Sequence, residues 1–151
     1  MDRIEVNVRE RIVKPVDDVF DAVVEPKRMS NYFISNASGP MTSGTRVDWE
    51  FADVGAKVTV DVVEVEQNRK IVFKSDPTDG EGTTTTIGFA PDGEGATVVT
   101  INEASFAMDP DGVQRAMGQT GGWTYFLACL KAYVTHGINL RVGLNKRITE
   151  I

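Results

Sequence analysis

A long helical pattern that follows a run of strand patterns constrains the fold of this chain most. Residues 44–104 are typical of strands, whereas 110–136 carry apolar residues three and four positions apart, which marks one face of a helix. At 1.5 Å per residue this helix would be about 40 Å long. It can bury its apolar face most simply against a curved antiparallel sheet. The sequence therefore predicts an α+β fold with a hollow between the sheet and the C-terminal helix.

Capping residues mark both ends of the long helix. Asp109 and Pro110 suit the first turn, and His136 with Gly137 suits the last. The helix interior holds three glycines, Gly118, Gly121 and Gly122. Each costs about 1 kcal/mol relative to alanine, so we expect a kink or a close approach to another backbone there.

Alternating apolar and polar residues predict six strands, at 4–12, 47–51, 58–65, 71–73, 83–89 and 97–104. The alternation slips at Val62 and Val63, which predicts a bulge that bends the sheet. Pro15 begins a short helix, Pro26 begins a second helical turn, and residues 32–43 are predicted to form a loop. Short, turn-rich links make consecutive strands antiparallel neighbours.

The 151 residues are predicted to form one domain over 1–137 with a tail over 138–151. Ile138, Leu140, Val142 and Leu144 alternate in this tail. The tail is interpreted as an added strand or short helix of the domain, or alternatively as the contact of a homodimer.

Charge and composition exclude several classes of partner. Asp and Glu outnumber Lys and Arg by 22 to 16, and no basic stripe indicates binding to nucleic acid. The chain shows no signal-like segment, and it has no apolar run of about 18 residues that would indicate insertion into a membrane. We therefore expect a cytoplasmic protein. Cys129 lies among apolar helical residues and is interpreted as a buried small side chain.

Signals of catalysis, metal binding or a cofactor are absent from the sequence. The only histidine, His136, is explained by its place at a helix end. No metal-binding spacing, phosphate-binding loop or nucleophile elbow occurs, so no catalytic residue, metal or cofactor is predicted. Glu103 is the one acid within a mostly apolar strand, and we expect its side chain to face solvent.

An ordered set of motifs over residues 4–137 resembles a known family. The motifs are VKPVDDVFDA at 13–22, Glu25-Pro26, Tyr32-Phe33, Gly44, VDW at 47–49, RKIVF at 69–73, TVVT at 97–100, Gly122-Trp123 and LACLK at 127–131. Together they resemble the homologues of the activator of the heat-shock-protein-90 ATPase, within the SRPBCC (START-like) superfamily. Phe20 departs from the family, which often has Trp there, and the tail lies outside the pattern.

The resemblance implies a helix-grip fold, as in the Bet v allergens. A curved six-stranded antiparallel sheet would wrap around the long helix, with two short helices after the first strand. Aromatic residues from several elements would converge on a cavity, unless they only fill the core. The predicted ligand-binding residues are Phe20, Tyr32, Phe33, Trp49, Phe51, Phe73, Phe89, Met117, Thr120, Trp123, Thr124 and Leu127.

Three functions follow from these observations. The first is non-catalytic binding of a small hydrophobic or amphipathic ligand, such as a lipid, in the cavity. The second, implied by the family, is a co-chaperone-like domain that stimulates a chaperone ATPase in the stress response. The third is a cyclase or hydrolase that uses a polar residue of the cavity.

Overall fold

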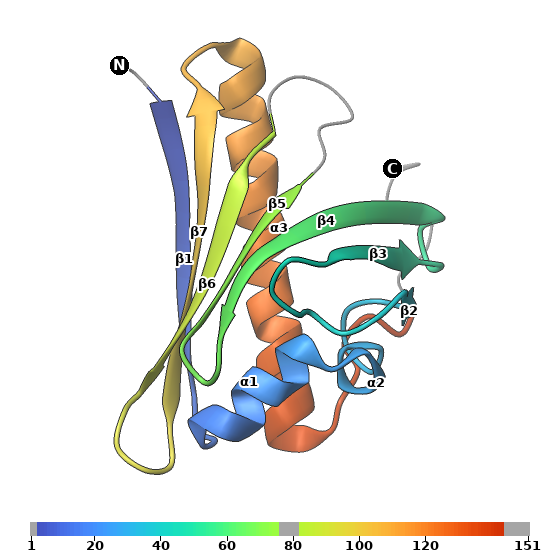
Figure 1. The fold of residues 1–151 in the computed structure, drawn as a ribbon, viewed down its shortest axis with the longest axis vertical. Helices are drawn as coiled ribbons and strands as arrows, with labels where there is room; N and C mark the ends of the chain where they lie inside the picture. Colours follow the sequence, from blue (N-terminus) through green and yellow to red (C-terminus); the bar gives the residue numbers. More distant parts are fainter. Residues whose placement is uncertain (1–2, 76–81, 144–151) are drawn as a thin grey trace.

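The computed structural model describes residues 3–75 and 82–143, in which one antiparallel sheet curves around a long helix (Figure 1). Its seven strands lie in the order β1-β7-β6-β5-β4-β3-β2. The first and last strands of the chain, β1 and β7, are therefore neighbours. All pairings are antiparallel, as the short links between consecutive strands predict.

The elements follow the predicted order closely. The strands are β1 (Arg3–Ile12), β2 (Asn36–Ala37), β3 (Arg46–Phe51), β4 (Ala56–Glu66), β5 (Lys70–Ser75), β6 (Thr84–Pro91) and β7 (Thr97–Ala107). The helices are α1 (Val16–Val24), α2 (Pro26–Met29) and α3 (Pro110–His136). The predicted count of six strands is wrong by one, because the segment 32–43 contains β2. With only two residues, β2 is too short to show an alternating pattern.

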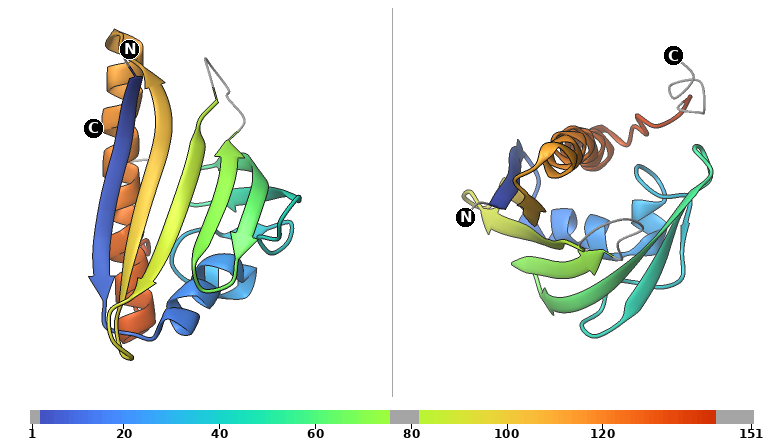
Figure 2. Two further views of the ribbon diagram at one scale, coloured as in Figure 1. Left: turned by 60° about the vertical axis from the view of Figure 1, so that its left-hand side comes forward. Right: turned by 90° about the horizontal axis from the view of Figure 1, so that it is seen from above.

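The helix α3 lies along the concave side of the sheet (Figure 2). The helices α1 and α2 cover the same side, near the C-terminal end of α3. Strand β4 contributes to the curvature of the sheet. Its register against β5 shifts between Val62 and Glu64, which confirms the predicted bulge. The core fills the space that these three helices and the sheet enclose.

The caps of α3 are confirmed in detail. The side chain of Asp109 accepts a hydrogen bond of 2.7 Å from the backbone N–H of Gly112. At the other end Gly137 adopts the left-handed conformation, with φ 66°, and its N–H donates to the carbonyl of Tyr133. These caps satisfy backbone groups that would otherwise have no partner at the helix ends.

The predicted close approach at the three glycines within α3 is wrong. A Cβ atom at Gly118, Gly121 or Gly122 would meet nothing within 4 Å, and α3 is one continuous helix through them. The close approach occurs at Gly112 instead, where a Cβ would collide with the carbonyl oxygen of Ala107. Gly112 thus allows the tight passage from β7 into α3.

A candidate ligand-binding site at the end of an aromatic cluster

Aromatic side chains from the sheet, the α2–β2 segment and α3 meet in the interior. Phe33 is at the centre of this aromatic cluster. Its ring makes edge contacts with Trp49, Phe51 and Phe126, with centroid distances of 5.7, 5.0 and 4.7 Å. Each such pair contributes about 0.5–1.5 kcal/mol beyond the burial of apolar area. Phe33 therefore joins the sheet to the inner face of α3.

The aromatic cluster continues from Phe33 along the concave face of the sheet. Trp49 contacts Phe73 at 5.6 Å, and Phe73 contacts Trp123 at 6.3 Å. Trp123 then contacts Phe126 at 5.4 Å, which closes a ring of contacts between β3, β5 and α3. The side chains of Trp49, Phe73 and Phe126 are at most 4% exposed, so the cluster is interior over most of its length.

The predicted ligand-binding residues fall into two groups. Tyr32, Phe33, Trp49, Phe51, Phe73 and Trp123 lie in the aromatic cluster, Leu127 is buried on the inner face of α3, and Phe20 pairs with Phe89 at 5.2 Å between α1 and β6. Met117, Thr120 and Thr124 are exposed on α3.

Two of the predicted ligand-binding residues, Thr120 and Thr124, do not offer their hydroxyl groups to the hollow. Their hydroxyl groups donate to the carbonyls of Ala116 and Thr120, four residues earlier on the same helix. Both side chains are exposed to solvent, so neither hydroxyl faces the interior.

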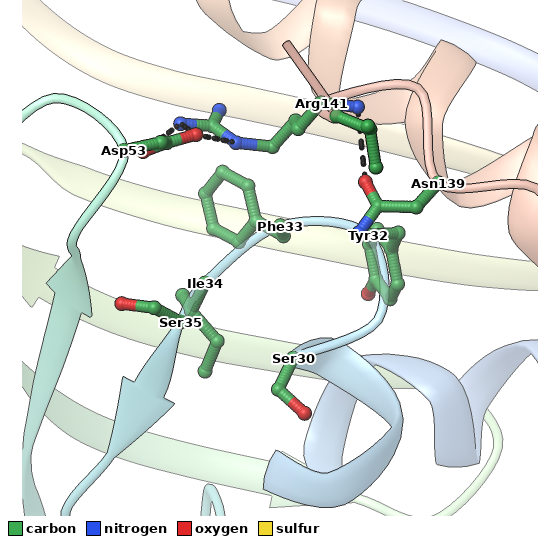
Figure 3. Close-up of a pocket in the computed structure, with 9 residues that line it drawn as sticks. Ser30, Tyr32, Phe33, Ile34, Ser35, Asp53, Asn139 and Arg141 are labelled. Atoms are coloured by element: carbon green, nitrogen blue, oxygen red, sulfur yellow. Dashed lines mark hydrogen bonds and ion pairs between the residues drawn. The ribbon is translucent and has the colours of Figure 1, made fainter. Parts of the chain in front are cut away.

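A pocket of about 190 Å³ opens at the edge of the aromatic cluster (Figure 3). It is lined by Ser30, Tyr32, Phe33, Ile34, Ser35, Asp53, Asn139, Arg141 and Val142. Phe33 belongs to both the pocket wall and the aromatic cluster, and its side chain is only partly buried. It thus separates solvent at the pocket from the interior.

The segment after α3 forms one wall of this pocket. The guanidinium of Arg141 donates from Nε and Nη2 to the two carboxyl oxygens of Asp53, at 2.9 and 3.0 Å (Figure 3). The same guanidinium lies 5.4 Å from the ring centre of Phe51. Two-pronged pairing and contact with a ring are the geometries that favour arginine over lysine. Arg141 therefore fastens this segment to the turn between β3 and β4.

The tail residues 138–143 form neither a strand nor a helix, and 140–143 form a turn, so the predicted added strand or short helix does not occur in them. Residues 144–151 lie outside the described residues. Sequence reasoning missed Arg141 as a pocket residue, because nothing in its alternating apolar surroundings indicates a partner 88 positions earlier.

Tyr32 forms the inner side of the pocket and supports the end of α1. Its hydroxyl donates a hydrogen bond of 2.8 Å to the carbonyl of Ala22. In a continuous helix that carbonyl would accept from the residue four positions later, but this residue is Pro26, which has no N–H. Burial raises the pKa of the Tyr32 phenol well above its ordinary value, so the group stays a hydrogen-bond donor.

The prediction that Glu103 faces solvent is wrong. Its side chain is 3% exposed and accepts hydrogen bonds from the Thr83 hydroxyl at 2.5 Å, the Gln119 amide at 2.8 Å and the Trp123 indole at 2.7 Å. The signal was present in the sequence, because Val99 and Ile101 point inward and a strand alternates with period two. Glu103 comes two positions after Ile101, so its side chain points inward as well.

Metal-binding and membrane-spanning features are not found in the part of the chain that the structure describes. Over residues 3–75 and 82–143, no group of three or more His, Cys, Asp or Glu side chains could hold a metal ion. No helix in those ranges has the length and apolar character needed to cross a bilayer.

The curved sheet, the long helix in its concave face and the aromatic interior with its pocket define a helix-grip protein. The chain belongs to the family described as Activator of Hsp90 ATPase homolog 1-like protein, whose model matches residues 14–135. No curated protein is similar enough in sequence to count as a relative.

Several solved structures share the fold. Protein SSP2350 from Staphylococcus saprophyticus is 30% identical, with a TM-score of 0.78 over 91% of this chain and 96% of that chain. DynU16, a protein of the dynemicin biosynthetic locus, is 25% identical with a TM-score of 0.79, over 89% of this chain and 48% of that one. An Aha1 dimer from Colwellia psychrerythraea has a TM-score of 0.76 at 18% identity, over 89% of this chain and 98% of that chain.

Proposed function

We propose that this protein binds a small hydrophobic or amphipathic ligand between the sheet and α3, and that the ligand enters at the pocket beside Phe33. The observation that carries the proposal is the dual position of Phe33. Its ring forms part of the pocket wall and also contacts Trp49, Phe51 and Phe126. A rotation of this one partly buried side chain would join the pocket to the aromatic cluster.

The size of the pocket limits what can bind without movement. Ligand pockets commonly measure about 300–1,000 Å³, whereas this one measures about 190 Å³. It can hold a ligand fragment as it stands, and a whole ligand would have to displace Phe33 inward. Binding would then be driven by apolar burial at about 25 cal/mol per Å², less the costs of association.

Residues of the aromatic cluster would then contact the ligand. We assign this role to Tyr32, Phe33, Trp49, Phe51, Phe73 and Trp123, with Leu127 behind them. Phe20 and Phe89 would shape the more distant end of the space, between α1 and β6.

Native mass spectrometry of freshly purified protein tests the proposal directly, because a bound ligand adds a defined mass. A thermal-shift screen with fatty acids, flavonoids and simple aromatic compounds gives a second test. A ligand at 100 times its Kd stabilises the folded state by about 2.7 kcal/mol, or about 5–10 °C for a chain of this size. If no compound class raises Tm and no mass is added, the proposal is wrong.

Two matched variants sharpen that test. Phe33→Trp places a larger ring at the pocket and should abolish the thermal shift. Phe106→Leu removes a comparable aromatic ring that is 1% exposed and neither lines the pocket nor belongs to the aromatic cluster, so it should keep the shift. Equal loss of binding in both variants would indicate general disruption of the core instead.

Family membership favours a second candidate function, stimulation of a chaperone ATPase. The matched family is described by its relation to the Hsp90 ATPase activator. A cytoplasmic chaperone and a role in the stress response would follow from it. Measuring ATP hydrolysis by a purified Hsp90-type chaperone, with and without this protein, tests the idea, and an unchanged rate would contradict it.

A homodimer is the remaining expectation about partners. One similar structure is that of an Aha1 dimer. A dimer of this chain would pair through the tail at 138–151. Sedimentation of the full chain and of a chain that ends at residue 143 would test it. A monomer in both cases would contradict it.

A further inference from the structure

A buried polar group lies at the far side of the aromatic cluster from the pocket. Glu103 on β7 points toward α3, and its direct cross-strand neighbour on β6 is Thr85. Opposite residues of an antiparallel pair share one face, with Cβ atoms about 4.5–5.5 Å apart. The carboxyl group and the hydroxyl group are therefore adjacent in the interior.

The partners of Glu103 are all neutral. Gln119 and Trp123 donate to Oε1, and Thr83 donates to Oε2. No ion pair to Glu103 occurs among residues 3–75 and 82–143. An apolar side chain of similar size would hold α3 on the sheet without the desolvation of a carboxyl group, which is unfavourable in an apolar interior.

Thr85 supplies an independent observation. Its side chain is 0% exposed, and its Oγ1 has no hydrogen-bond partner among the described residues. A buried hydroxyl without a partner destabilises a folded protein. Phe73 of the aromatic cluster is the neighbour of Thr85 on its other side, in β5. This hydroxyl therefore lies between the aromatic cluster and Glu103.

Glu103 and Thr85 can each still form a hydrogen bond with a ligand. A carboxylate offers about four lone-pair positions, of which three are used, so that one remains on Oε2. The hydroxyl of Thr85 can both donate and accept. A ligand hydroxyl could donate to Glu103 and accept from Thr85, and an amino group could donate to both.

We propose that Glu103 and Thr85 form the polar subsite of the ligand site and select ligands that carry a hydroxyl or amino group over carboxylic acids. A ligand carboxylate would bring a second acceptor group to Glu103 with nothing to donate. The inference rests on the proposed ligand-binding function and names the chemical class of the ligand: an alcohol, phenol or amine with an apolar, aromatic-sized body.

Trp123 provides a direct reporter for this subsite. Its indole N–H donates to Glu103, and the chain has one other tryptophan, Trp49, so two indole signals are expected. The experiment is an NMR titration of the two indole N–H signals, assigned with Trp49→Phe. The probes are 2-phenylethanol, 2-phenylethylamine and phenylacetate, which share one apolar body and differ in the polar group.

The alcohol and the amine should shift the Trp123 signal and bind about tenfold more tightly than phenylacetate, as expected for one well-placed hydrogen bond in an apolar site. Equal affinity for the three probes would overturn the subsite and leave the ligand-binding function intact. Binding of none of them, together with no mass added in native mass spectrometry, would contradict both.

Variants separate recognition from a structural role. Glu103→Gln should reduce the preference for the alcohol and amine over phenylacetate to within about threefold. Thr85→Val should leave Tm of the free protein unchanged or raise it, because it removes a hydroxyl without a partner, and should weaken binding of 2-phenylethanol about tenfold.

Thr100→Val is the matched control, since Thr100 is exposed on the same strand as Glu103 and should change neither property. Thr85→Val keeps the proposal testable if Glu103→Gln does not fold. A fall in Tm with unchanged affinity in Thr85→Val would assign the hydroxyl to the folded structure alone and overturn the proposal.

Discussion

Arg141 and Asp53 form a two-pronged ion pair that joins the segment after α3 to the turn between β3 and β4. Their side chains are 13% and 25% exposed, so water screens the pair less than an ion pair on the open surface. The pair also encloses one side of the pocket beside Phe33.

Asp53→Asn should therefore lower the free energy of unfolding by about 1–2 kcal/mol, between the values for exposed and fully buried pairs. Urea denaturation measures this change. Asp92→Asn is the matched control, because the Arg11–Asp92 pair is more than half exposed on both sides, and its loss should cost less than about 0.5 kcal/mol. Equal effects would contradict the structural role of Arg141.

Replacing Phe126 tests how tightly the aromatic cluster is packed. Phe126 is 1% exposed and contacts Tyr32, Phe33 and Trp123. Phe126→Ala should destabilise the fold by about 3–5 kcal/mol because it leaves a cavity. Met117→Ala, at a side chain 70% exposed on the same helix, should change stability by less than about 0.5 kcal/mol. Thermal and urea unfolding of both variants would show whether the difference exists.

The glycines of α3 give a prediction with opposite signs. Gly121→Ala should stabilise the protein by about 0.5–1 kcal/mol, since the added Cβ meets nothing and alanine favours the helix. Gly112→Ala should destabilise it, because the Cβ would collide with the carbonyl of Ala107. Thermal unfolding should give a higher Tm for Gly121→Ala and a lower Tm for Gly112→Ala than for the unchanged chain. A fall in both would mean that the outer face of α3 is covered.

Tyr32 predicts a loss of stability at alkaline pH. Burial holds its folded-state pKa above the ordinary value of 10.0, so above pH 10 the unfolded chain releases the phenol proton while the folded chain keeps it. The stabilisation is complete below pH 10 and declines by up to about 1.4 kcal/mol per pH unit as the pH rises toward the folded-state pKa.

Tyr32→Phe should remove this part of the pH dependence, although it loses the hydrogen bond to Ala22, worth about 1 kcal/mol. Urea denaturation at pH 8 and pH 11 measures both effects. Curves for the variant and the unchanged chain that fall in parallel between these pH values would show that Tyr32 is not the group responsible.

Local patterns predicted most of the fold. Asp109, Gly137 and the slip at Val62 act through their own backbone or that of their neighbours, so the sequence indicates their roles without knowledge of the fold. β2 could not be predicted, because two residues show no period and their strand character depends on pairing with β3. Gly112 could not be identified either, because its collision partner Ala107 is set by the geometry of the turn.

Less of the candidate site could be predicted from the sequence. The alternating phase of β7 contained the inward position of Glu103, but the general rule that acids face water outweighed it. Arg141 and Asp53 are far apart in sequence, and only the curvature of the sheet brings the turn after β3 to the end of α3. Such pairings depend on the whole fold and leave no local pattern.

The wall of the pocket formed by residues 139–142 lies beyond the stretch 14–135 that the family model matches. It is attached through the Arg141–Asp53 ion pair, the contact of Arg141 with Phe51 and a hydrogen bond from the Tyr125 hydroxyl to the carbonyl of Leu140, and it contributes no residue to the buried core. Proteins that share the helix and sheet can therefore diverge in what they admit by exchanging a short peripheral segment while the interior stays the same. In this architecture, selectivity at the entrance and stability of the scaffold can evolve separately.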